Sequence, residues 1–213
     1  MELTLYIIEI LGTISFAISG AIAAIHKKMD LLGIWTMSVV TAVGGGYIRD
    51  LTLGITPPSA FINSRYMIIA TITTAVFLVI IDKWQAHKGW TSKLLALALE
   101  KLIDLSDAVG LGMFTVSGVS TAITRGYGDN FVLILFVGAI TGVGGGMLRD
   151  VFTCEIPVIF TKRIYAVASL IGAVSFYFLR TLIDEKVAVF ATVGLVTIIR
   201  LLSSHYEWSL PKV

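Results

Sequence analysis

Charged residues are scarce in this sequence of 213 residues. Asp, Glu, Lys and Arg make up 14% of the chain, against about 25% in soluble domains. Hydrophobic residues make up 56%, and the mean hydropathy is +0.90. A soluble domain of this size cannot bury so much apolar surface, which excludes an ordinary cytosolic enzyme and a disordered chain. The net charge of +2 is too small to indicate a nucleic-acid partner. The composition predicts an all-α, polytopic membrane protein.

Residues that build disulfides, metal sites and covalent catalytic centres are also few. The one cysteine, Cys154, has no partner for an internal disulfide. The three histidines lack the spacing of metal ligands, and no Ser-His-Asp or Cys-His arrangement can be placed on one surface. We therefore expect no metal site, no bound cofactor and no enzymatic activity.

Long apolar stretches account for most of the chain. A membrane-spanning helix needs about 20 mostly apolar residues. Seven stretches meet this need: residues 3–25, 31–53, 62–81, 102–123, 131–152, 164–182 and 187–203. The connections are short, so residues 1–213 are predicted to form a single transmembrane domain. Within the longest connection, residues 91–101 are a candidate helical extension of the fourth span.

Lysine and arginine are distributed unevenly between the two sides of the membrane. With Arg49 and Arg149 left out, four fall on one side, namely Arg65, Arg125, Arg180 and Lys186. Ten fall on the other side, namely Lys27, Lys28, Lys83, Lys88, Lys93, Lys101, Lys162, Arg163, Arg200 and Lys212. Basic residues favour the cytoplasmic side. We therefore expect the N-terminus outside the cell's inner (plasma) membrane and the C-terminus in the cytoplasm.

An internal duplication is the strongest signal in the sequence. The block Gly-Gly-Gly-x-x-Arg-Asp occurs at residues 44–50 and again at 144–150. The preceding spans match as well: Glu9, Gly12, Phe16, Ser19 and Gly20 align with Asp107, Gly110, Phe114, Ser117 and Gly118. Each unit holds three spans, about 3–81 and about 102–182, so the second unit enters the membrane from the opposite face. The predicted architecture is two inverted three-helix repeats with an accessory seventh helix at about 187–203, and such proteins place their transport path at the repeat interface.

Each block begins with three consecutive glycines inside a span: Gly44, Gly45 and Gly46, then Gly144, Gly145 and Gly146. Glycine inside a helix costs about 1 kcal/mol relative to alanine. One interpretation is a broken helix whose freed backbone groups line a watery path. The alternative is close helix packing. Packing normally spaces small residues four apart, so a contiguous triplet favours the broken helix.

Each block ends in a charged pair inside the membrane, Arg49-Asp50 and Arg149-Asp150. An unpaired charge near the centre of a spanning helix costs about 2.5–3.5 kcal/mol. Sequence neighbours on a helix point about 100° apart, so an arginine is not expected to face the aspartate that follows it. The pairs are either buried structural ion pairs or part of a pore or substrate site.

Depth in the membrane suggests partners for the arginines. At about 1.5 Å per residue, Glu9 and Arg49 lie at similar height in the outer leaflet. By the inversion, Asp107 and Arg149 share the inner leaflet. We predict proximity within each of these two pairs, with the neighbouring aspartate free to face the path. The hydroxyls of Ser19 and Ser117, which sit beside matched glycines, either line the path or serve helix packing.

These features together resemble the prokaryotic TRIC family of trimeric intracellular cation channels, also known as UPF0126 or glycine-transporter-domain membrane proteins. The resemblance rests on both intact Gly-Gly-Gly-x-x-Arg-Asp blocks, the inverted repeats and the seventh helix. It implies a homotrimer in membrane lipid, with a pore in each protomer for monovalent cations, K⁺ over Na⁺. It further implies that the glycine triplets kink the second and fifth helices around this pore, with Arg49, Asp50, Arg149 and Asp150 in or near it.

Two functions follow from these observations. In a passive cation channel, selectivity rests on carboxylates, hydroxyls and backbone carbonyls, with the arginines as gates or structural locks. In a secondary transporter of glycine or another small zwitterion, an adjacent arginine and aspartate meet the carboxylate and the ammonium of the substrate. The residues alone fit both functions, and the resemblance favours the channel.

Overall fold

A computed structural model describes residues 2–86, 92–161 and 164–206, and these residues are helical almost throughout. The long helices are α1 (Glu2–His26), α2 (Leu31–Thr52), α4 (Arg65–Ala86), α5 (Ser92–Ala122), α6 (Phe131–Phe152), α8 (Ile164–Leu182) and α9 (Glu185–His205). Two short helices, α3 (Ser59–Ile62) and α7 (Val158–Thr161), and a π-helical turn (Ile123–Tyr127) lie between them. Within the described residues, seven helices are long and apolar enough to cross a membrane, as predicted.

Two of the predicted boundaries need comment. The third span begins at Arg65 rather than at residue 62, because Ile62 belongs to the separate helix α3. Helix α5 begins at Ser92, so the predicted extension of the fourth span is confirmed for all of its described residues, Thr91 lying outside them. Lys88, Lys162, Arg163 and Lys212, which contribute to the charge bias, also lie outside the described residues. The orientation in the membrane stays a prediction.

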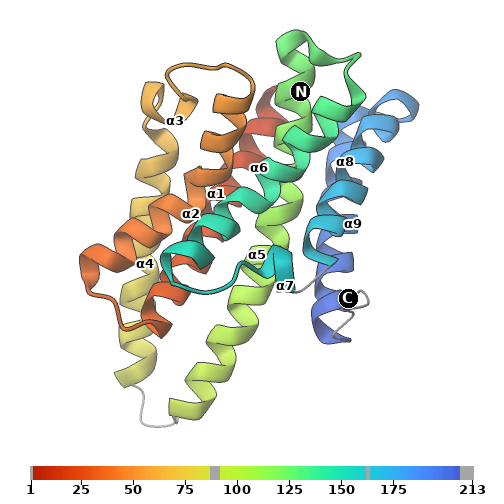
Figure 1. Ribbon diagram of the computed structural model, residues 1–213. Helices are drawn as coiled ribbons and strands as arrows, with labels where there is room; N and C mark the ends of the chain where they lie inside the picture. The colour runs from red at the N-terminus through yellow and green to blue at the C-terminus, as the bar shows by residue number, and fades with distance from the viewer. Residues whose placement is uncertain (1, 87–91, 162–163, 207–213) are drawn as a thin grey trace.

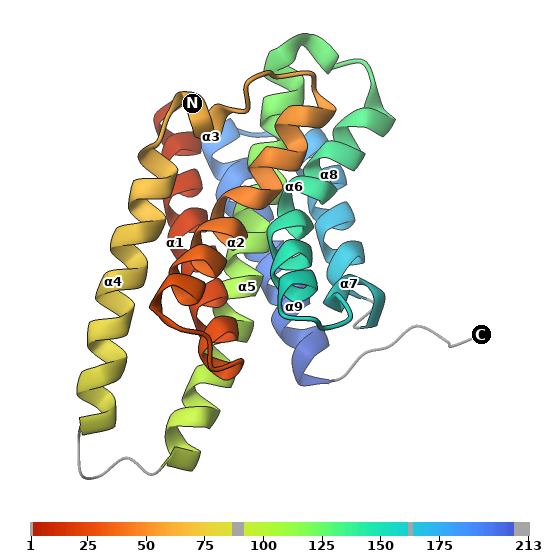
Figure 2. The same ribbon diagram turned by 60° about the vertical axis from the view of Figure 1, so that its left-hand side comes forward.

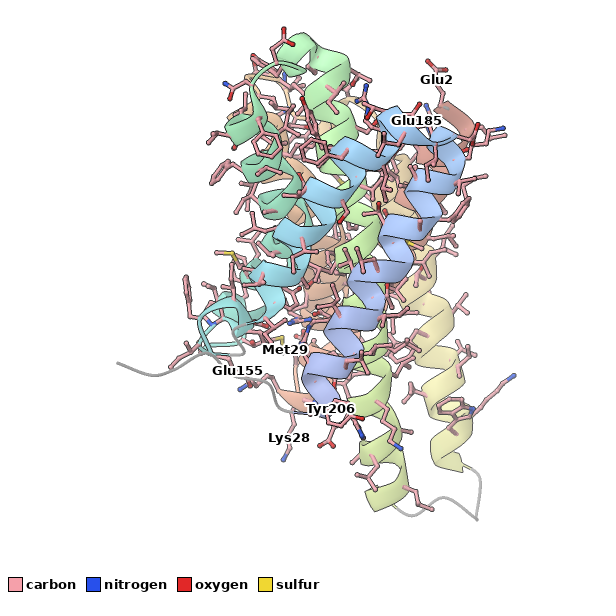
Figure 3. All side chains as sticks on the ribbon, turned by 90° about the vertical axis from the view of Figure 1, so that its right-hand side faces the viewer. Glu2, Lys28, Met29, Glu155, Glu185 and Tyr206 are labelled. Carbon is pink, nitrogen blue, oxygen red and sulfur yellow. The ribbon has the colours of Figure 1, made fainter. Side chains whose placement is uncertain are left out.

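The helices form two three-helix units and one added helix (Figures 1 and 2). The first unit is α1, α2 and α4, and the second is α5, α6 and α8. Helices α1 and α5 pack against each other at the centre, α2 packs on α6, and α9 packs on α5 and α8. Glu2 and Glu185 lie at one end of the molecule, whereas Lys28, Glu155 and Tyr206 lie at the other (Figure 3). We call these the Glu2 end and the Glu155 end.

Local signals at the ends of α2 and α6 show the duplication clearly. The side chain of Asp30 accepts a hydrogen bond from the Gly33 N–H at 2.7 Å, and that of Asn130 accepts one from the Leu133 N–H at 3.1 Å. Both are N-caps of the type that asparagine and aspartate favour. The two helices end alike, two residues after the arginine–aspartate pair, at Thr52 and Phe152. Equivalent sequence signals therefore start and stop the equivalent helices.

Helices α2 and α6 are unbroken through both glycine triplets, so the predicted break is wrong. The triplets instead let the two helices cross in close contact. A Cβ built on Gly45 would overlap the carbonyl oxygen of Thr141, and one built on Gly145 would overlap that of Thr41. Close packing, the alternative interpretation, is what the fold contains. A break would leave backbone groups without partners in lipid, at a cost of several kcal/mol each.

Candidate functional site

A cluster of charged and hydroxyl side chains, which we call the Glu9 site, lies toward the Glu2 end of the repeat interface. It consists of Glu9, Arg49, Asp50, Tyr66 and Ser117. An Nη1 atom of Arg49 lies 3.7 Å from a carboxylate oxygen of Glu9, so the predicted proximity of this pair is confirmed. The hydroxyl of Tyr66 also donates a short hydrogen bond to Glu9.

Asp50 is not free to face a path, contrary to the prediction. It is 1% exposed, and its Oδ1 atom accepts a hydrogen bond from Nε of Arg49 at 2.8 Å. Its Oδ2 atom accepts the backbone N–H of Ser59, the first residue of α3, at 2.7 Å. The 100° offset between sequence neighbours is overcome because the arginine side chain is long enough to fold back beside its own helix. The aspartate thus ties the end of α2 to the segment that follows.

A second cluster, the Asp107 site, lies toward the Glu155 end and is built from the same parts. Nη1 of Arg149 lies 2.8 Å from Asp107, which confirms the second predicted pair. Arg149 also donates to Asp150 through Nε at 2.9 Å and Nη2 at 2.8 Å. Asp150 in turn accepts the backbone N–H of Val158 at 2.9 Å. Asp150 is therefore held as Asp50 is, and the expectation that it is free is wrong for the same reason.

Each of the two serines belongs to one repeat and contacts the charged site of the other. Ser117, from the second repeat, donates to Glu9 at 2.6 Å and accepts from Arg49 at 3.3 Å. Ser19, from the first repeat, accepts a short hydrogen bond from Arg149. Both serines are buried. Each charged site is therefore completed by a hydroxyl from the other repeat, so the serines bind the ion pairs instead of serving helix packing alone.

Each site opens into a pocket. The pocket at the Glu9 site has a volume of about 40 Å³, and its lining includes Glu9, Arg49, Asp50, Tyr66 and Phe114. The pocket at the Asp107 site has a volume of about 170 Å³. Its lining includes Asp107, Arg149 and Asp150, together with His26, Lys27, Asp104, Glu155 and Arg200. This second pocket is the larger and the more highly charged of the two, and we call it the inner pocket after its place in the predicted orientation.

An apolar barrier lies between the sites. Along α1, Phe16 falls between Glu9 and Ser19, and along α5, Phe114 falls between Asp107 and Ser117. The two rings pack with centroids 5.2 Å apart and are 1% and 8% exposed. Ten residues of helix separate Glu9 from Ser19, which places the two sites about 15 Å apart along the axis. In this conformation the pockets are separated by packed aromatic side chains.

Sequence reasoning missed three side chains of these sites. Tyr66 and Tyr165 occupy matching places near the start of α4 and α8, so a longer repeat alignment would have found them. Tyr66 binds Glu9, whereas Tyr165 is buried beside Gly146 of the Asp107 site. Arg200 falls at the end of the predicted seventh span and is counted with the charges of the C-terminal side, but it is 4% exposed and lines the inner pocket. Nothing in the local sequence separates it from a snorkelling arginine.

Two inverted three-helix repeats, with a charged site in each half of the interface, define a polytopic membrane protein of the channel or transporter class. The family model described as glycine transporter matches residues 6–82 and 104–181, once in each repeat. A UPF0126 membrane protein of Vibrio cholerae is 35% identical over 170 residues, which cover 80% of this chain and 66% of that protein. The UPF0126 inner membrane protein YadS of Escherichia coli is 36% identical, with 79% and 75% covered.

Solved structures agree with this assignment. A prokaryotic TRIC channel crystallised in 0.5 M KCl is 33% identical, with 99% of this chain and 100% of that chain covered and a TM-score of 0.85. The TRIC trimeric intracellular cation channel orthologue from Rhodobacter sphaeroides is 30% identical, with 96% and 98% covered and a TM-score of 0.80. The chain belongs to the TRIC/UPF0126 family, as its doubled motif predicted. These structural neighbours are channels and not enzymes.

Proposed function

We propose that this protein is a channel for monovalent cations, K⁺ over Na⁺, with a separate path through each protomer of a homotrimer in the inner membrane. One observation carries the proposal: two equivalent carboxylate-rich sites lie in line at the repeat interface, about 15 Å apart. Solved relatives of the same fold are cation channels, which supports it. The permeant ion and the surrounding lipid are the only ligands that the function requires.

The proposed path runs between α1, α2, α5 and α6. It enters at the inner pocket, passes the Asp107 site and the Phe16–Phe114 pair, and leaves by the Glu9 site. Conduction requires the two aromatic rings to separate, because packed apolar side chains exclude a hydrated ion. The close crossing of α2 and α6 beside these rings is the element that would have to shift.

The arginines are compatible with a cation path because carboxylates outnumber them. Glu9 and Asp50 together with Arg49 leave the Glu9 site with a net charge of −1. Around Arg149, Asp107 and Asp150 likewise leave a net charge of −1 before Arg200, which also lines this pocket, is counted. Each arginine thus holds its carboxylates in position without cancelling their attraction for a cation. The hydroxyls of Ser117 and Tyr66 add further oxygen ligands beside Glu9.

A secondary transporter of glycine or another small zwitterion is the second candidate. The observation that favours it is the mixed lining of the inner pocket, where arginine and aspartate side chains lie within one cavity of about 170 Å³. Such a lining can meet a carboxylate and an ammonium together. The two functions differ in their need for an organic solute: a channel conducts ions without one, whereas the transporter moves the solute itself.

Purified protein in liposomes and planar bilayers separates the two candidates. We expect unitary K⁺ currents, and Glu9→Gln should reduce the K⁺ conductance because the Glu9 site loses its net negative charge. Glu2→Gln is the matched control, since Glu2 lies on the same helix and is exposed. Saturable glycine counterflow without unitary currents would overturn the channel in favour of the transporter.

A further inference from the structure

The accessory helix α9 breaks the symmetry of the two sites. It has no counterpart in the repeats, and it places Arg200 in the pocket of the Asp107 site. Arg200 is 4% exposed, and its Nε atom has no hydrogen-bond partner among the described residues. Its guanidinium carbon lies 5.0 Å from the centroid of the Tyr165 ring. A buried guanidinium with a free donor therefore faces the inner pocket.

The equivalent position in the other half of the molecule holds no cation. Tyr66, the counterpart of Tyr165, donates its hydroxyl to Glu9. The charged residues that line the Glu9 pocket are Glu9, Arg49 and Asp50 alone among the described part of the chain, so that site keeps its net charge of −1. With Arg200 added to Arg149, the deep part of the Asp107 site has two cations against Asp107 and Asp150 and is neutral.

The remaining charges of the inner pocket do not remove this difference. Lys27 and Glu155 form an ion pair at 2.8 Å, and their side chains are 39% and 59% exposed. Asp104 accepts a hydrogen bond from Ser204 at 3.0 Å, is partly exposed, and lies about one helical turn nearer the Glu155 end than Asp107, so its charge belongs to the mouth of the pocket and not to its deep part. Charges in contact with water are screened, whereas Arg200 and Asp107 are buried and act at close range.

We propose that Arg200 is a fixed positive barrier that makes cation permeation depend on direction. This inference rests on the proposed channel function. A cation that enters from the Glu155 end meets a neutral site under the field of Arg200, whereas one that enters from the Glu2 end meets a negative site. The current of cations from the Glu155 end is therefore the smaller of the two in symmetric salt. Divalent cations are repelled more strongly than monovalent ones, because the Coulomb energy scales with charge.

The test uses excised patches of bacterial spheroplasts that express the full chain, in which every channel faces the same way. In symmetric KCl of about 0.1 M, the wild type should rectify, and Arg200→Gln should raise the smaller current on the order of fivefold and make the two directions equal. Arg200→Lys keeps the charge and should keep the rectification. Lys186→Gln is the matched control, because Lys186 lies exposed at the opposite end of the same helix.

Ionic strength supplies a second readout, which separates buried Arg200 from the exposed charges at the mouth. Raising KCl to about 1 M shortens the Debye length to about 3 Å and screens Lys27 and Glu155, whereas the field of buried Arg200 persists, so the wild type should still rectify. Loss of the rectification at about 1 M KCl would overturn the inference. A wild type that conducts equally in both directions at low salt, or an Arg200→Gln channel with unchanged rectification, would overturn the inference. The wild-type salt series decides the matter even where Arg200→Gln does not assemble. Absence of any wild-type K⁺ current refutes the proposed function instead.

Discussion

Gly45 is the position where a single added methyl group should lower the stability of the protein most. Its Cα faces the α6 backbone so closely that a Cβ would overlap the carbonyl oxygen of Thr141. The overlapped atom is backbone within a helix and cannot rotate away, so Gly45→Ala has to push α2 and α6 apart. Overpacking of this kind costs about 1–3 kcal/mol. The gain in helix propensity, about 1 kcal/mol at most, offsets only part of it.

Gly46 provides the matched control in the same triplet. A Cβ there would meet only the guanidinium of Arg49, with its nearest atom Nη2 at 3.7 Å, which is an ordinary contact with a flexible group. Gly46→Ala should therefore leave the free energy of unfolding unchanged or raise it slightly. The two variants have the same composition and differ only in which side of α2 receives the methyl group.

Thermal unfolding of the detergent-solubilised protein, followed by intrinsic tryptophan fluorescence, measures the difference. For a chain of this size 1 kcal/mol corresponds to about 2–4 °C in Tm. Gly45→Ala should then unfold at least several degrees below Gly46→Ala. Equal melting temperatures for the two variants would refute the close α2–α6 crossing and would favour the broken, path-lining helix instead.

Three further predictions concern the charged sites and the orientation. Arg149→Gln leaves buried carboxylates without their cation and should lower the free energy of unfolding by about 3–5 kcal/mol in denaturant titrations. Arg125 is exposed, so Arg125→Gln should change the free energy of unfolding by less than about 0.5 kcal/mol. Equal effects of the two variants would contradict the buried network. Tyr66→Phe removes a hydrogen bond to a carboxylate and should cost about 1.5 kcal/mol, with exposed Tyr127→Phe as the neutral comparison. Cys154 is exposed near the Glu155 end, so a membrane-impermeant maleimide should label it in inverted vesicles and not in intact cells; the opposite labelling would reverse the predicted orientation.

Much of the charged site could be predicted from the sequence. Equal depth in antiparallel spans was enough to predict the Glu9–Arg49 and Asp107–Arg149 pairs, because helical rise converts residue number into height. Height alone does not give rotation or side-chain conformation. The arginines therefore reach their neighbouring aspartates, and the aspartates bind the backbone of Ser59 and Val158, in ways that sequence spacing argued against.

The glycine triplets show the same limit for packing. Three glycines remove side chains from one stretch of helix, and both a break and a close approach are consistent with that loss. The choice depends on what lies opposite. Gly145 meets the backbone of Thr41 and the ring of Phe16, so the space is filled by protein and the helix keeps its hydrogen bonds.

The amino-acid sequence by itself determined the class of this protein, its seven spans and its inverted duplication. The length of each apolar stretch has to match the thickness of the bilayer, and internal repetition is visible in the order of residues alone. Tertiary structure alone decided which side chains complete each site. Ser19 and Ser117 cross between repeats, and Arg200 reaches the inner site from a helix outside both of them. These contacts join residues far apart in the chain, and they depend on helix rotation and crossing, which packing of the whole bundle sets and no local pattern encodes.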